Sequence, residues 1–137
     1  MKSIKLVLFL FITLCIFGCK KDDPVSSSPT LSGRWECRLS DQSNPSIGFT
    51  TFLDLTDNSG TVTGTFTPYG NSVPMSGTLS SSGDLTLNGQ ISSEAYFVKT
   101  KVNTARNSMN GYTTFYGSLQ QNGTRMLLFD MNLVGTK

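Results

Sequence analysis

Few side chains in this sequence could do chemistry, and they are scattered. The chain contains no histidine, which excludes histidine-based general acid/base catalysis, a Ser-His-Asp triad and the usual zinc sites. A pair of carboxylates is the remaining option, but nothing singles one out as a glycosidase-like pair among Asp54, Asp57, Asp84, Glu94 and Asp130. We therefore expect a protein that is not an enzyme, with no catalytic residue, no metal site and no cofactor.

Cys19 is the residue whose surroundings predict a definite chemistry. Lys2 and Lys5 precede an almost continuous apolar run over 6–17, and Gly18 stands directly before the cysteine. A run of this length is typical of a secretory leader and is shorter than the roughly 20 residues that span a bilayer. The small Gly18 suits a signal peptidase. The alternative is an uncleaved membrane anchor in which Cys19 is incidental.

The segment Ile16-Phe17-Gly18-Cys19 resembles the lipobox of bacterial lipoproteins. The resemblance implies that residues 1–18 are a lipoprotein signal peptide. It also implies that Cys19 becomes the mature N-terminus and carries a diacylglyceryl thioether and a further acyl chain such as palmitate. Buried acyl chains contribute about 0.8 kcal/mol per CH₂ group, so several of them would make the membrane anchor effectively permanent.

The charged residues 20–23, Lys-Lys-Asp-Asp, resemble the signal that follows the lipidated cysteine in surface-exposed lipoproteins of the Bacteroidota. That resemblance implies a location on the outer face of the outer membrane. A charged, solvated linker on the periplasmic face is the alternative. Residues 19–30 as a whole are rich in proline and serine, which indicates a flexible tether that reaches about 30 Å when extended.

Charge and cysteine content limit what the remaining domain, residues 31–137, can be. The chain has 11 basic and 9 acidic side chains, and loss of Lys2 and Lys5 with the leader would bring the net charge close to zero. Without a basic stripe we expect no nucleic-acid partner. Cys37 would be the only thiol left, so no internal disulfide can form. We expect a monomer whose fold depends on packing, with Cys37 as a buried and unreactive thiol.

From residue 31 onward the apolar residues recur with a period of two, which predicts β-strands separated by short turns. Inward-facing residues are expected within eight segments: 35–39, 47–55, 62–66, 73–79, 85–91, 96–102, 109–119 and 127–133. Eight consecutive antiparallel strands can close into a barrel, and closure removes the exposed edges. Five glycines inside the predicted strands match the corner positions of a small barrel. We predict an all-β, eight-stranded up-and-down barrel; a β-sandwich is the alternative.

The start of the first strand, with Gly33 and Trp35, resembles the Gly-x-Trp motif of the calycins, which include lipocalins and avidin-like barrels. The resemblance implies a lipocalin-like barrel whose tryptophan plugs the closed end and is covered by a basic residue late in the chain. Because the last strand runs antiparallel to the first, Arg125 falls at the opposite end. Lys137 is the basic residue available near Trp35.

Two hypotheses for function come from the barrel. An eight-stranded barrel is either filled by side chains or holds one small ligand, and the sequence leaves this open. The first hypothesis is a small apolar ligand at the barrel mouth, with a possible lining of Phe49, Phe66, Met75, Tyr96 and Phe115. The second is an interaction or inhibitor barrel whose loops 41–46 or 103–107 dock to an envelope or host protein. Outward-facing Phe97, Tyr112 and Tyr116 could form a further binding surface.

Overall fold

The computed structural model describes residues 29–120 and 122–137. The expected signal peptide, Cys19 and nearly all of the tether lie outside the described residues. Eight strands make up the domain: β1 (Gly33–Asp41), β2 (Gly48–Asn58), β3 (Thr61–Thr67), β4 (Val73–Leu79), β5 (Asp84–Ile91), β6 (Glu94–Val102), β7 (Ser108–Leu119) and β8 (Arg125–Thr136). A short 3-10 turn, Pro68–Gly70, joins β3 to β4. Within residues 29–120 and 122–137, no helix has the length and apolar character needed to cross a bilayer.

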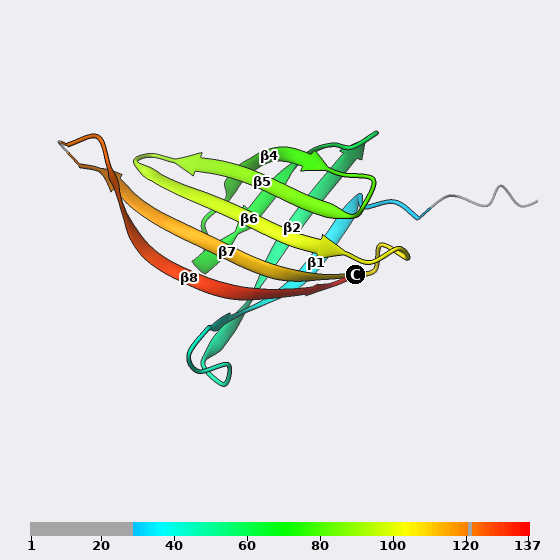
Figure 1. Cartoon of the computed structure of the whole chain (residues 1–137), viewed down its shortest axis with the longest axis horizontal. Coiled ribbons are helices and arrows are strands. Elements are labelled where there is room, and N and C mark those ends of the chain that lie inside the picture. Colours follow the sequence, from blue (N-terminus) through cyan, green and yellow to red (C-terminus); the bar gives the residue numbers. More distant parts are fainter. Residues whose placement is uncertain (1–28, 121) are drawn as a thin grey trace, which may run out of the picture.

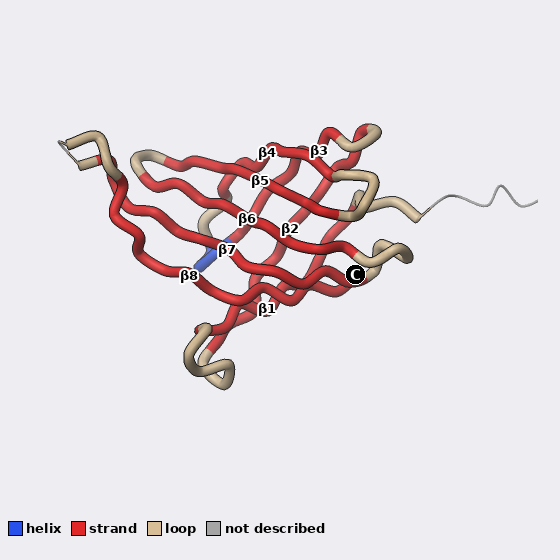
Figure 2. Tube along the Cα trace, viewed as in Figure 1, coloured by secondary structure: helices blue, strands red, loops and turns tan. Residues whose placement is uncertain are grey.

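The strands form a closed barrel in which each strand pairs with the next one along the chain. All pairs are antiparallel, and β8 returns to pair with β1 (Figure 1). The predicted lipocalin-like, up-and-down barrel is therefore confirmed, and the sandwich is wrong. Figure 2 shows the connecting loops gathered at two ends of the strands.

The predicted alternation of faces holds in most of the strands. Trp35, Cys37 and Leu39 of β1 are fully buried, whereas the residues between them are exposed. Among the described residues, the inward-facing side chains and Leu31 make up one core cluster of 19 residues. The sequence left open whether the barrel is filled by side chains or hollow. Its core includes the fully buried Phe66, Leu53, Leu87 and Leu133. The interior of the barrel is filled over most of its length.

A glycine inside β4 permits a close approach of two strands. A Cβ atom on Gly77 would lie 1.8 Å from the carbonyl oxygen of Thr86 on β5, which is far inside van der Waals contact. No side chain fits there without a movement of the backbone. This agrees with the expectation that glycines within strands mark tight corners of the barrel.

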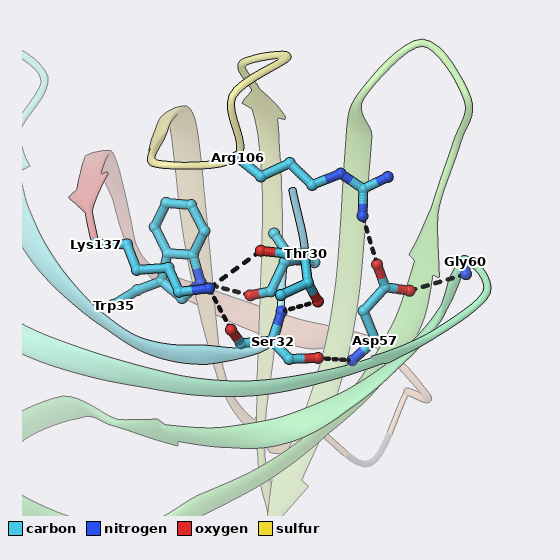
Figure 3. A network of polar contacts seen from close by, with 8 residues as sticks. Thr30, Ser32, Trp35, Asp57, Gly60, Arg106 and Lys137 are labelled. Carbon is cyan, nitrogen blue, oxygen red and sulfur yellow. Dashed lines mark hydrogen bonds and ion pairs between the residues drawn. The ribbon is translucent and has the colours of Figure 1, made fainter. Parts of the chain in front are cut away.

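Trp35 and the two ends of the domain close one end of the barrel. The Trp35 indole N–H donates to the carbonyl of Leu31 at 2.9 Å. Lys137 Nζ lies 5.9 Å from the centre of the Trp35 ring and donates to the carbonyls of Thr30 and Ser32 (Figure 3). The expected positions of Trp35 and Lys137 are confirmed. Gly33 has a φ of +127°, and a Cβ there would lie 2.8 Å from Lys137 Cε, so glycine suits this position.

A second set of polar contacts, also drawn in Figure 3, ties this closed end together. The backbone N–H of Asp57 donates to Ser32 Oγ at 2.8 Å. The Asp57 carboxylate accepts from Gly60 N at 2.9 Å and from Arg106 Nη1 at 2.7 Å. Its side chain is only 7% exposed. Asp57 therefore connects the entering chain, the β2–β3 turn and the β6–β7 loop.

The opposite end of the barrel, which we call the mouth, is open and uneven. β1 ends at Asp41, whose partner on β8 is Met131, so residues 125–130 of β8 pair only with β7. Figure 1 shows the β7–β8 hairpin and the β1–β2 hairpin pointing away from each other at this end. Four consecutive apolar residues in this part of β8 are exposed: Met126, Leu127, Leu128 and Phe129.

Two inward-facing predictions are wrong at the mouth, those for Ile47 and Leu127, and Phe129 faces inward but is left uncovered. Ile47 is 62% exposed because it lies in the β1–β2 loop, before β2 begins. Phe129 keeps the inward phase opposite Phe115 but is 54% exposed because β1 does not extend far enough to cover it. Leu127 is also 54% exposed. The pairing shifts between Phe115 and Tyr116, and such a bulge moves the residues beyond it to the other face.

Candidate functional site

The hollow at the mouth is the candidate binding pocket. It has a volume of about 210 Å³ and is lined by Tyr69, Asn71, Glu94, Tyr96, Phe115, Tyr116, Leu128 and Phe129. Pockets for drug-sized ligands span roughly 300–1,000 Å³. This pocket therefore suits a compact molecule or a small head group, and a long acyl chain would not fit within it.

Aromatic rings build most of the pocket wall. The ring centres of Tyr96 and Phe115 are 5.2 Å apart, in an edge-to-face arrangement. Phe129 lies 6.4 Å from Phe115 on its other side. Edge-to-face pairs at these distances stabilise one another by about 0.5–1.5 kcal/mol beyond the area they bury. The wall is thus held in place before any ligand arrives.

Of the five predicted lining residues, Tyr96 and Phe115 line the pocket. Phe66 is fully buried, and its ring centre lies 6.4 Å from Tyr96 and 6.2 Å from Phe115, so it supports these rings. Phe49 is half-buried at the rim, where its ring centre is 4.3 Å from that of Tyr69. Met75 is 3% exposed and belongs to the packed core.

Glu94 provides the charge of the pocket. The Tyr96 hydroxyl donates to Glu94 Oε2 at 2.6 Å. Burial, together with this hydrogen bond to Glu94, raises the pKa of Tyr96 to about 12, so the phenol stays protonated and continues to donate at neutral pH. The pocket therefore combines apolar walls with one oriented carboxylate.

Sequence reasoning did not single out Glu94, Tyr69 or Leu128 as pocket residues. The signal for Glu94 was present, because it stands two residues before Tyr96 and so faces the same side of β6. Glu94 is exposed as the first residue of β6, where it borders the pocket. Tyr69 and Leu128 carried no such signal, since a turn places the first and a bulge places the second.

Two further hollows adjoin each other on the outer face of the barrel. One, of about 390 Å³, is lined by Phe97, Lys99, Tyr112, Thr114, Tyr116 and Arg125. The other shares Phe97 and Arg125 and continues across β5 to β4. Phe97 and Tyr116 meet edge to face at 5.4 Å. The predicted outward phase of Phe97, Tyr112 and Tyr116 is confirmed.

The remaining candidate carboxylates have structural partners. Asp54 pairs with Arg34 at 3.2 Å, and Asp84 pairs with Lys101 at 3.0 Å. Asp130 accepts from Thr114 at 3.1 Å, and Asp57 belongs to the closed end. In the described part of the chain, no group of three or more Asp, Glu or Cys side chains is placed to hold a metal ion.

Cys37 is fully buried, as predicted. Burial, with a smaller effect of the Glu36 charge, raises the pKa of its thiol to about 12.

The fold and the pocket define a class: a small lipocalin-like barrel, plugged at one end and hollowed at the other. No model of a known protein family matches this chain, and neither a curated protein nor a solved structure is significantly similar to it. The geometry of the barrel is therefore the basis for the function proposed below.

Proposed function

We propose that this protein is a cell-envelope lipoprotein of the Bacteroidota type whose lipocalin-like barrel binds a small apolar ligand at its mouth. The observation that carries the proposal is the aromatic pocket at the open end of a barrel that is otherwise filled. Rigid aromatic walls around a small number of polar groups are the usual composition of small-molecule sites. The protein acts by binding and is not an enzyme.

The anchor completes the proposal. Cys19 would be lipidated and would hold the monomeric barrel at the outer face of the outer membrane, near envelope or host proteins. The described chain enters the barrel at the closed end, where Thr30 contacts Lys137. A tether that leaves from this end supports an orientation in which the mouth points away from the membrane. Cys19→Ser should abolish labelling with radioactive palmitate and release the protein from the membrane fraction.

Native mass spectrometry of the protein purified from its own host tests the ligand hypothesis. We expect a co-purifying small molecule on the wild-type chain. Leu128→Trp, which adds a large side chain to the pocket wall, should remove it. Thr50→Trp, at an exposed position of β2, is the matched control and should retain it. Wild-type protein that carries no small molecule would count heavily against the proposal.

A second candidate function, docking to an envelope or host protein, is favoured by the exposed run 126–129 on β8. The two loops named from the sequence lie at opposite ends of the barrel, so they do not form one docking surface. An unpaired, apolar strand edge can accept a strand from a partner. Leu127→Lys should abolish co-purification of such a partner and leave the small molecule of the first hypothesis in place.

A further inference from the structure

The lining of the mouth pocket has an unusual combination of rings and charge. Five aromatic side chains contribute to it: Tyr69, Tyr96, Phe115, Tyr116 and Phe129. Glu94 is its one charged lining residue among those that the structure describes. A purely apolar guest needs the rings but gains nothing from a carboxylate, which must lose water when such a guest binds.

From this combination we infer that the ligand of the mouth is a small organic cation, with a methylated or otherwise apolar ammonium head. The inference rests on the proposed function and specifies its ligand. Ring faces carry negative potential and attract ammonium groups within about 6 Å. A carboxylate on the same wall adds a full opposite charge. Both features disfavour an anionic guest.

The geometry leaves Glu94 able to serve such a guest. Its Oε2 accepts a hydrogen bond from Tyr96, which orients the carboxylate. Among the described residues none donates to Oε1, so this oxygen can accept from the ligand. Arg125, the first residue of β8, lines the outer hollows instead. Arg125 Nη1 donates to the carbonyls of Ser93 and Gly117, which holds the guanidinium on the outer face.

Tyr69 adds a second sign of a built site. Its backbone lies in the left-handed region, with φ 49° and ψ 32°, which bulky residues rarely adopt. The side chain is 64% exposed, yet its ring packs on Phe49 and borders the pocket. A strained aromatic residue held at a pocket rim fits a role in contacting a guest.

The test compares two probes that differ in one atom. Choline carries a trimethylammonium head, and 3,3-dimethyl-1-butanol has a neutral tert-butyl group in its place. Titration of the full chain, followed by NMR shifts of the pocket residues, should show choline binding about tenfold more tightly. Glu94→Gln should remove most of this roughly tenfold preference for choline. Glu36→Gln, the same change at an exposed position of β1, should retain it. Thermal unfolding of each variant establishes that it is folded.

Each outcome separates this inference from the proposed function. If the neutral probe binds as tightly as choline to the wild-type chain, the inference is overturned and an apolar-ligand function stands. The inference is also overturned if the molecule that co-purifies from the host is neutral or anionic. If neither probe shifts the pocket residues and no molecule co-purifies, both the inference and the proposed function fail.

Discussion

At the scale of single residues, Cys37 shows how burial determines reactivity. The thiolate is the reactive form, and burial raises the pKa of Cys37 to about 12. At about pH 8 we expect iodoacetamide to modify Cys37 at least about a hundredfold more slowly in the folded protein than in denaturant. Mass spectrometry of the peptide that contains Cys37 measures both rates. Equal rates would show that the thiol is exposed in solution.

Tyr96 should link stability to alkaline pH. Its pKa is about 12 in the folded protein, raised from 10.0 by burial and by the hydrogen bond to Glu94. The folded state therefore favours the protonated phenol. Its contribution to stability is complete below pH 10 and is lost as the pH rises towards 12.

The measurement is the free energy of unfolding in urea at about pH 9 and about pH 11, where linkage predicts a change. The free energy of unfolding of the wild-type chain, taken relative to that of Tyr96→Phe, should be smaller at the higher pH than at the lower pH. A difference that stays constant with pH would contradict the burial and the hydrogen bond of Tyr96.

At the scale of strands, much of the fold could be predicted because apolar and polar residues alternate along a strand that has one buried face. The alternation of Trp35, Cys37 and Leu39 placed β1 correctly, and turn residues separated all eight strands. The mouth could not be predicted in the same way. Nothing in the sequence marks the bulge that turns Leu127 outward. The exposure of Phe129 depends on where β1 ends, and β1 is distant from it in the sequence.

The approach of β4 to β5 provides a test of the barrel itself. Gly77→Ala would place a methyl group against the Thr86 carbonyl, at 1.8 Å before any adjustment. We expect a loss of at least about 2 kcal/mol in the free energy of unfolding, because overpacking forces the backbone to move. Ser76→Ala, at the exposed neighbouring position, should change stability by less than about 0.5 kcal/mol. Similar values for both variants in urea denaturation would refute the close approach.

At the scale of the whole molecule, the two ends of the barrel have separate roles. The closed end carries the structural contacts of Trp35, Lys137 and Asp57, and the mouth carries the pocket. Of these, the Trp35 plug and its lysine followed from the Gly-x-Trp resemblance. The Asp57–Arg106 contact joins residues 49 positions apart and had no counterpart in the sequence pattern.

Asp57→Ala should separate stability from binding. It leaves Gly60 N–H and Arg106 without their acceptor, which should cost about 1–3 kcal/mol in the free energy of unfolding. The matched control is Asp54→Ala on the same strand, whose pair with Arg34 is exposed and should contribute under about 1 kcal/mol. Choline affinity, measured well below the unfolding temperature, should be unchanged in both variants. A loss of affinity in Asp57→Ala would mean that the two ends are coupled.

The seam between β1 and β8 has a mechanical consequence. Its residue pairs run from Glu36–Thr136 at the closed end to Asp41–Met131 nearer the mouth. Tension between Pro29 and Lys137 would separate these pairs in succession and at low force. Tension between Pro29 and a guest held at the mouth would instead run along the strands and load their cross-strand hydrogen bonds together in shear. The barrel should accordingly resist a load transmitted from a captured molecule far better than one applied between its own two ends.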